Sequence, residues 1–222
     1  MFVVAAVSQK GGAGKTTVAV NLAVMAERAG LATVILDLDP QASSAHWGDR
    51  RTGQTPVVVA AQASRLARHL DDARRAGAGV AIIDTGPAAD NAAMVAAKAA
   101  DLVLVPVRPS ALDLDALEAT LTITSLARKP TWVIINGVAA NSRTGNDMEK
   151  ALADLKVDIA PVRLGQRVDY SVPMSAGQTV VEWAPTGRSA AEVTQLWDWL
   201  RAKIGRKPGG RTATTHRQGQ VA

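Results

Sequence analysis

The chain has 222 residues, 47% apolar and 20% charged, so it is large enough to bury one full-sized core. It contains no cysteine, which excludes disulfides, thiolate catalysis and cysteine-ligated iron–sulfur clusters. No basic stretch precedes the apolar N-terminal residues, and no run of about 18 apolar residues occurs. We therefore expect neither a signal peptide nor a membrane-spanning helix. We expect the protein to be cytoplasmic.

The net charge of +5 comes from the C-terminal end. Residues 201–222 hold six basic residues and no acidic one, namely Arg201, Lys203, Arg206, Lys207, Arg211 and Arg217. Such a segment can attract nucleic acid or an acidic membrane surface, or it can be a solvated, disordered end. We predict one domain over residues 1–204, followed by a basic and disordered tail over 205–222.

Apolar runs and helical patterns alternate along the predicted domain. Residues 2–7 fit a strand buried on both faces, which enters a glycine-rich loop and a helix from about Lys15 to Ala29. Further strands are predicted at 33–36, 57–60, 80–83, 102–105 and 132–135, a shorter one at 157–160, and helices at 64–76, 112–127 and 190–204. This alternation predicts a single α/β domain with a mostly parallel, twisted sheet and helices on both faces.

The loop between the first strand and the first helix has the composition of a phosphate-binding loop. It reads QKGGAGKTT over residues 9–17. Small residues let backbone N–H groups surround phosphate oxygens, and the helix that follows directs its positive end toward them. Lys15 would supply a charge to the β- and γ-phosphates of a nucleotide, and Thr16 a hydroxyl ligand for Mg²⁺. Position 9 is Gln where the usual motif has Gly, and Lys10 is an additional lysine.

Acidic residues follow two of the predicted strands. Asp37 and Asp39 come after the second strand in the segment DLDPQ, and Asp84 ends the apolar run AIID. An aspartate at the carboxyl end of a parallel strand faces the ligand crevice of such a sheet. We expect Asp84 to hold Mg²⁺ through water. Either segment alone could equally be a turn or a helix cap.

At these residues the sequence resembles the ParA/MinD family of deviant-Walker ATPases. The resemblance rests on KGGAGKTT (10–17), DLDPQ (37–41), IIDTGP (82–87), PVRPSALD (106–113), QRVDY (166–170) and GQTVVE (177–182), and it extends to about residue 204. The short chain and the PVRPSALD block are most similar to the small ParF-type plasmid partition ATPases. The segment DTGP departs from the commoner D-x-P-P form.

The resemblance implies a Mg²⁺-dependent ATPase whose site residues can be carried over by position. Lys10 would reach the nucleotide of the partner subunit in an ATP-sandwich dimer, and Asp39 would orient the attacking water. Asp37 would brace the loop and the outer shell of the metal, alongside Thr16 and Asp84. ATP would contact Lys10, Gly11, Gly12, Ala13, Gly14, Lys15, Thr16 and Thr17, with adenine at Asn136 and at main-chain groups near Pro161.

The partners implied are an ATP-dependent second copy, non-specific DNA, and a centromere-binding or adaptor protein that stimulates slow hydrolysis. The protein would then be associated with the nucleoid. Arg163 and Arg167 are candidate DNA contacts. The helix at 190–204 is amphipathic, and we expect it to pack on the sheet and not to serve as a membrane anchor.

Three functions remain open at this point. The first is DNA partition by an ATP-driven switch. The second is the same switch applied to a protein cargo or to DNA transfer. The third is a metabolic P-loop ligase, such as a dethiobiotin-synthetase-like enzyme. Lys10 argues against the third, because a lysine that acts across a dimer serves a switch.

Overall fold

The computed structural model describes residues 1–87 and 90–204. The predicted tail lies outside the described residues. The strands are β1 (Phe2–Ala6), β2 (Thr33–Asp37), β3 (Val57–Ala60), β4 (Val80–Asp84), β5 (Leu102–Val107), β6 (Thr131–Val138) and β7 (Leu164–Gly165). The helices are α1 (Lys15–Arg28), α2 (Ser43–Asp49), α3 (Leu66–Arg75), α4 (Asp90–Ala99), α5 (Ala111–Ala127), α6 (Thr144–Asp154), α7 (Val180–Trp183) and α8 (Arg188–Ile204), with short 3₁₀ turns at Ala63–Arg65, Val168–Tyr170 and Pro173–Ala176.

The seven strands form one sheet in the order β3-β2-β4-β1-β5-β6-β7, and every pairing is parallel. This confirms the α/β fold predicted from the sequence. The predicted strand at 157–160 is not formed, because only Ile159 makes an isolated bridge to Val133. The last strand instead follows a few residues later and pairs with the end of β6. The helices α2, α4, α6 and α7 were not predicted from the sequence.

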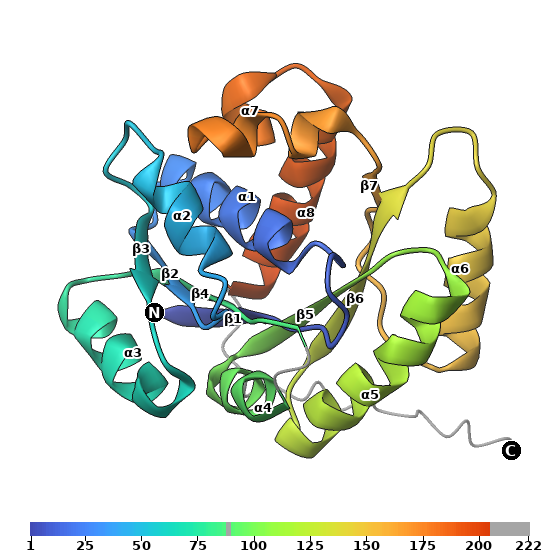
Figure 1. Cartoon of the computed structure of the whole chain (residues 1–222), viewed down its shortest axis with the longest axis horizontal. Helices are drawn as coiled ribbons and strands as arrows, with labels where there is room; N and C mark the ends of the chain where they lie inside the picture. The colour runs from blue at the N-terminus through green and yellow to red at the C-terminus, as the bar shows by residue number, and fades with distance from the viewer. Residues whose placement is uncertain (88–89, 205–222) are drawn as a thin grey trace, which may run out of the picture.

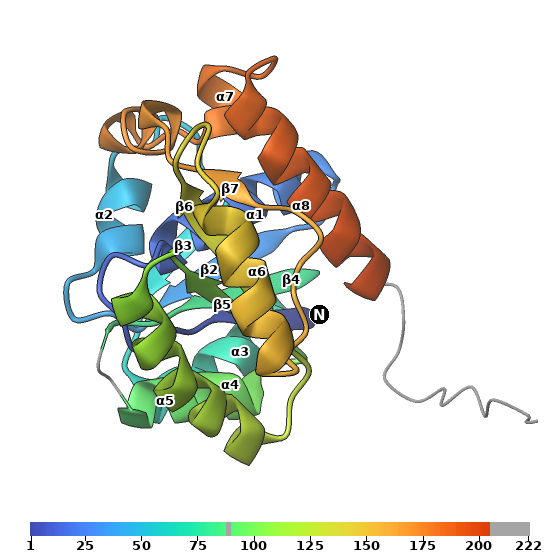
Figure 2. The same cartoon turned by 90° about the vertical axis from the view of Figure 1, so that its right-hand side faces the viewer.

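Alternate residues of the strands point into two separate cores. One core contains Val4, Ile35, Ile82 and Leu104 and packs against α1, α2, α7 and α8. The other contains Val3, Leu36, Ile83 and Val105 and packs against the helices of the opposite face. Figures 1 and 2 show these two helical layers with the sheet between them. Burial on both faces explains why the strands are continuous apolar runs.

Helix α8 lies on the same face of the sheet as α1, as the sequence predicts. Val193, Leu196, Trp197 and Leu200 are buried in the core that they share. Trp199 packs edge-on against Trp132 at 5.0 Å between ring centroids. Among the helices of the described residues, none is both long and apolar enough to cross a membrane.

The strand order places three strand ends side by side. β4 lies between β1 and β2, and the register pairs Asp84 with Ala6 on one side and with Asp37 on the other. The loops that leave these three strands therefore start from one edge of the sheet. This edge carries the phosphate loop, Asp37, Asp39 and Asp84.

Candidate nucleotide-binding site

The loop between β1 and α1 has a backbone that only glycine adopts without strain at two positions. Gly12 has φ of 73° and Gly14, at the N-terminus of α1, has φ of 102°. A Cβ atom on Gly14 would lie 2.1 Å from Nδ2 of Asn136. The same amide nitrogen donates a hydrogen bond of 2.7 Å to the carbonyl oxygen of Ala13. The glycine therefore allows the end of β6 to hold the phosphate loop directly.

Lys15 is the first residue of α1, and its side chain turns back over the loop. It is buried, and its Nζ donates to the carbonyl oxygen of Lys10 at 3.0 Å. Burial lowers the pKa of the Lys15 ammonium, against the opposing charges of Asp84 and Asp39. The ammonium thus lies within the electrostatic reach of both carboxylates, at the start of a helix whose positive end favours anions.

Asp84 accepts hydrogen bonds from two hydroxyl groups that belong to different helices. Thr16 donates to its Oδ2 at 2.7 Å, and Ser44, at the start of α2, donates to the same oxygen at 2.6 Å. Asp84 is completely buried, and burial raises its pKa to about 7, although the hydrogen bonds from Ser44 and Thr16 oppose this rise. Its other oxygen, Oδ1, is buried and has no hydrogen-bond partner among the described residues.

Asp37 is turned toward the backbone of the segment that follows it. Its Oδ1 accepts from the N–H of Asp39 at 3.0 Å, and its Oδ2 accepts from the N–H of Ala45 at 2.9 Å. The side chain therefore fixes the loop after β2 and satisfies a free N–H in the first turn of α2. Burial raises the pKa of Asp37, and the backbone hydrogen bonds partly offset this. The structure thus shows the contacts by which Asp37 braces the loop, whereas the role of Asp37 near a metal stays a prediction.

Asp39 and Lys10 are both partly exposed. One oxygen of Asp39 accepts from the N–H of Gln41 at 2.9 Å, and the carboxylate lies against Gly86. In residues 1–87 and 90–204, the ammonium of Lys10 makes no hydrogen bond or ion pair. Asp39 therefore faces the space over the loop, and Lys10 has no salt bridge to any residue that the structure describes.

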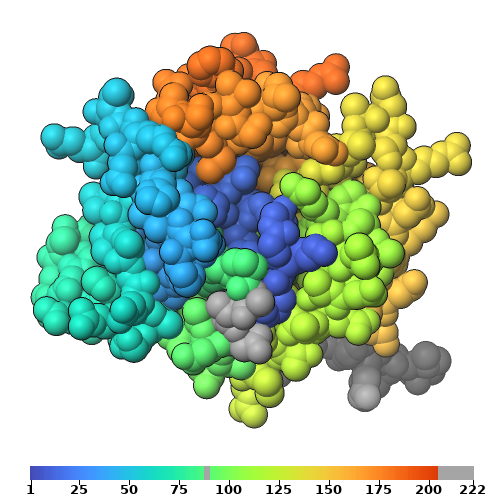
Figure 3. Space-filling model, viewed as in Figure 1, coloured from blue at the N-terminus to red at the C-terminus, as the bar shows by residue number. Residues whose placement is uncertain are grey.

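A cavity of about 830 Å³ lies over these residues. Figure 3 shows this hollow, with the blue phosphate loop at its base between α2, α5 and the orange segment that contains the 3₁₀ turns at Val168–Tyr170 and Pro173–Ala176. Its walls include most of the predicted site together with residues that the sequence analysis did not select for it. The latter are Gln41, Ser43, Pro87, Arg108, Gly137, Gly165, Gln166, Val168, Tyr170, Ser171 and Met174, and Arg167 was predicted only as a DNA contact.

The two residues predicted to contact adenine lie in different places. Asn136 lines the cavity, at the end of β6. Pro161 lines a different hollow, together with Ile159 and residues of α6. The reason is the pairing of β7, whose Leu164 lies opposite Asn136. In the segment around β7, the residues that reach the cavity therefore begin at Gly165.

The residues over the loop fit a nucleotide with a divalent cation. A hydroxyl and a carboxylate are hard oxygen ligands of the kind that Mg²⁺ prefers. The unpartnered Oδ1 of Asp84 would gain a partner in a bound cation or in its water shell. The cavity volume is within the range of ligand sites.

These features define a phosphate-loop nucleotide-binding protein, and the comparisons with known proteins agree. Residues 4–178 match the family described as the CobQ/CobB/MinD/ParA nucleotide binding domain, and the chain belongs to that family. The predicted ParA/MinD resemblance is thereby confirmed.

Two relatives show the range of proteins to which the chain is similar. The maintenance of carboxysome distribution protein A of Gloeobacter kilaueensis is 40% identical over 121 residues, which cover 54% of this chain and 55% of that protein. The protein ParA of Rhizobium radiobacter is 37% identical over 117 residues, which cover 51% of each chain. The chain thus matches about half the length of these relatives.

Solved structures share the fold at low sequence identity. The septum site-determining protein MinD of Pyrococcus horikoshii, solved in complex with Mg-ADP, gives a TM-score of 0.73. The match covers 92% of this chain and 97% of that protein at 18% identity. At this identity the likeness shows the fold alone.

Proposed function

We propose that this chain is a Mg²⁺-dependent ATPase that acts as a dimerising switch on DNA. The observation that carries the proposal is the contact of Thr16 and Asp84, from α1 and β4, beside a buried Lys15 and with one Asp84 oxygen left without a partner. The family of the chain supports a nucleotide as ligand. The proposal extends this to ATP, to its hydrolysis and to the use of hydrolysis as a switch.

Each residue has a role set by its position. Thr16 and Asp84 would hold Mg²⁺, which when bound supplies positive charge to the phosphate oxygens. Lys15 adds a fixed cation at the same place, and the N–H groups of the glycine loop bind the phosphates. Asp39, at the cavity wall, would orient the water that attacks the last phosphate.

Lys10 supports the dimerising part of the proposal. Its ammonium has no ion pair among the described residues of its own subunit. In an ATP-bound dimer it would contact the phosphates in the partner subunit. The ATP-bound dimer would then bind non-specific DNA on the nucleoid. A centromere-binding or adaptor protein would stimulate slow hydrolysis and release it.

The cargo divides the proposal into two candidates. Plasmid or chromosome partition is favoured by the similarity to the protein named ParA. A protein assembly as cargo is favoured by the 40% identity to a protein named for carboxysome distribution. Both use the same ATPase, whereas a metabolic ligase would need neither an ATP-driven change from monomer to dimer nor DNA.

Light scattering and a DNA gel shift test the switch directly. With Mg²⁺ and a slowly hydrolysed ATP analogue we expect the mass to double and non-specific DNA to be retarded. With ADP we expect a monomer without DNA binding. Turnover of ATP by the protein alone should stay well below ~1 s⁻¹, the low end of ordinary enzyme rates. A monomer that binds the analogue but neither dimerises nor binds DNA would overturn the switch.

A further inference from the structure

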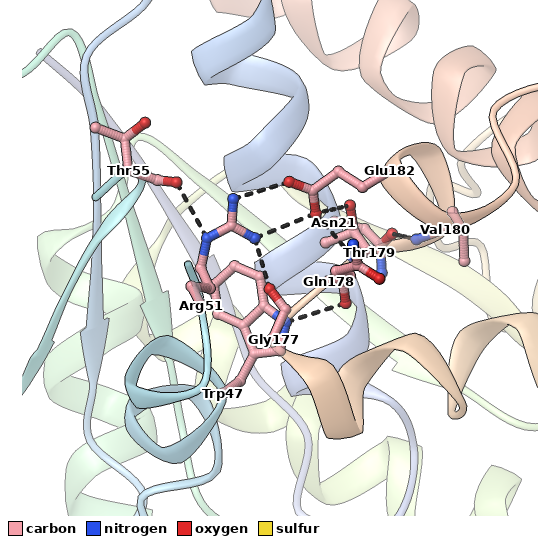
Figure 4. Close-up of polar contacts among 9 residues, drawn as sticks. All are labelled: Asn21, Trp47, Arg51, Thr55, Gly177, Gln178, Thr179, Val180 and Glu182. Carbon is pink, nitrogen blue, oxygen red and sulfur yellow. Dashed lines mark hydrogen bonds and ion pairs between the residues drawn. The ribbon is translucent and has the colours of Figure 1, made fainter. Parts of the chain in front are cut away.

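The segment from Gly177 to Glu182 contacts both α1 and α2, and we call it the brace. Figure 4 shows its polar contacts, which come from three parts of the chain that are far apart in the sequence. The brace includes the capping box of α7, in which Glu182 accepts from the N–H of Thr179 at 2.8 Å and from its hydroxyl at 2.9 Å. Glu182 is therefore held in one orientation before any other residue contacts it.

The brace grips the C-terminal end of α2. Arg51 donates two hydrogen bonds to Glu182, of 2.8 and 3.1 Å, and a third to the carbonyl oxygen of Gly177 at 2.7 Å. Its guanidinium also lies over the ring of Trp47, 4.6 Å from the centroid. The indole N–H of Trp47 donates to the carbonyl oxygen of Gln178 at 3.1 Å, and the Trp47 side chain is fully buried.

The backbones meet closely at this contact. A Cβ atom on Gly177 would lie 2.5 Å from the backbone nitrogen of Arg51. Only glycine allows the brace to approach α2 this closely, and Gly177 also has a positive φ of 66°. Close backbone packing against the brace thus fixes the position of the C-terminal end of α2.

The brace is joined to α1 by Asn21. Its Oδ1 accepts from the N–H of Val180 at 3.2 Å, and its Nδ2 donates to the carbonyl oxygen of Thr17 at 2.8 Å. Asn21 is buried, so both bonds are shielded from water. Thr17 directly follows the proposed metal ligand Thr16. The brace therefore connects the first turn of α1 to α2 through a short chain of hydrogen bonds.

The opposite end of α2 carries the proposed catalytic machinery. Asp37 accepts the N–H of Ala45, Ser44 donates to Asp84, and Asp39 lies in the loop before the helix. Because α2 spans only Ser43–Asp49, a displacement at its C-terminal end moves the whole helix and this loop. A shift of about 1 Å in a catalytic group can lower a rate 100-fold.

We infer that Arg51 and Glu182 are positioning residues that fix α2 against α1, and so hold Ser44 against Asp84 and Asp39 at the cavity wall. The inference rests on the proposed ATPase function. The pair is well shielded, since the side chains are 9% and 21% exposed. Although burial opposes it, hydrogen bonds from Arg51 and Thr179 lower the pKa of Glu182, so the carboxylate is ionised at neutral pH. Two charged hydrogen bonds in parallel define orientation as well as distance.

The test compares two Arg–Glu pairs in the same protein. Glu182→Ala removes the brace contact, and Glu182→Gln keeps the capping box, which accepts either residue, but removes the charge. The matched control is Glu149→Ala, which breaks the pair of Arg163 with α6 on a different part of the fold. For each variant we would measure unfolding, ATP affinity, turnover, and hydrogen exchange of the backbone amides of residues 38–46 without nucleotide.

We expect Glu182→Ala to lower turnover about 10-fold while ATP affinity changes less than about 3-fold, because only the catalytic geometry is disturbed. The amides of 38–46 should exchange faster than in the wild type. The turnover and the amide exchange of Glu182→Gln should lie between those of the wild type and of Glu182→Ala. Glu149→Ala should change neither turnover nor exchange, whatever its effect on stability.

Two results separate this inference from the proposed function. If the wild type hydrolyses ATP and Glu182→Ala, at equal folded fraction, matches Glu149→Ala in turnover and exchange, the pair only stabilises the fold and the inference is wrong. If the wild type hydrolyses no ATP, the proposed function fails. The exchange of 38–46 then decides alone whether Glu182 positions α2, with faster exchange in Glu182→Ala supporting it and unchanged exchange overturning it.

Discussion

The side-chain amide of Asn136 donates a hydrogen bond of 2.7 Å to the carbonyl oxygen of Ala13. This contact joins the end of β6 to the phosphate loop across 123 positions of the sequence. The resemblance to the ParA/MinD family predicts that Asn136 contacts adenine, and the structure shows that this side chain supports the loop. The space for the contact depends on Gly14.

Gly14→Ala should abolish nucleotide binding and destabilise the protein. The new Cβ would overlap with Asn136, and alanine is strained at a φ of 102°. We expect a loss of about 2–6 kcal/mol in the free energy of unfolding, since strain and overpacking each cost about 1–3 kcal/mol. Gly30→Ala is the matched control, because Gly30 has a φ of 77° with nothing within 4 Å of an added Cβ. Chemical denaturation should show the smaller loss for Gly30→Ala, and equal losses would contradict the proposed overlap.

Lys15→Ala and Asp39→Ala should fail at different steps. The first removes the cation at the phosphates, and we expect ATP affinity to fall roughly 10- to 100-fold, from the loss of a charged hydrogen bond. The second removes a carboxylate that faces water, so ATP should bind nearly as in the wild type while turnover falls by about 100-fold or more. Calorimetric titration and a phosphate-release assay separate the two effects, with Lys98→Ala, at an exposed lysine of α4, as control. Normal turnover of Asp39→Ala would remove Asp39 from its assigned role.

Lys10→Ala should yield a monomer that still holds ATP. The ammonium of Lys10 forms no ion pair among the described residues of its own chain, so its loss leaves the local structure unchanged. The cross-subunit contact to negative charge would be lost, and with it the DNA binding of the ATP-bound dimer. Sizing with a slowly hydrolysed ATP analogue checks this. A full-sized dimer of the variant would show that Lys10 does not act across the interface.

Asp84 should make the nucleotide-free protein less stable as the pH rises from about 4 to 7. The folded carboxyl keeps its proton up to a pKa of about 7, whereas in the unfolded chain it ionises near pH 4. The folded state therefore holds the extra proton in this range, and stability falls with rising pH. Asp84→Asn should flatten most of this slope in denaturation curves at pH 5 and pH 8. Asp37 would leave a residual slope of the same sign, because its pKa is also raised. An unchanged slope in Asp84→Asn would show that Asp84 is ionised in the folded protein.

Deleting residues 206–222 should weaken DNA binding and its dependence on salt. The deletion removes Arg206, Lys207, Arg211 and Arg217, and each lost phosphate contact lowers the salt slope by roughly 0.9. The full-length protein with these four residues changed to Gln is the control for length. Gel shifts at several salt concentrations check the slope in the ATP-bound state. An identical slope in all three proteins would identify the tail as a solvated end.

The sequence alone established the phosphate loop and the parallel sheet, for a local reason. A glycine-rich loop between an apolar strand and a helix depends on residues 2–17, and strands buried on both faces are recognisable as apolar runs. The helix α2 was not predicted because its seven residues include four polar ones and a glycine, and contacts with Asp37, Asp84 and the brace hold it in place. The strand predicted at 157–160 is not formed for a similar reason. Whether an apolar run becomes a strand depends on the strand beside which it lies in the sheet.

Only the tertiary structure decided which side chains meet. The spacing of Asp37 and Asp84 does not show that their strands are adjacent, that Ser44 shares Asp84 with Thr16, or that Asn136 holds the loop. Arg51 and Glu182 are separated by 131 positions, and no local pattern marks them as partners. Local propensities and buried faces are properties of short segments and can be predicted from composition. A contact between distant residues depends on strand order and helix packing, which the whole chain determines together.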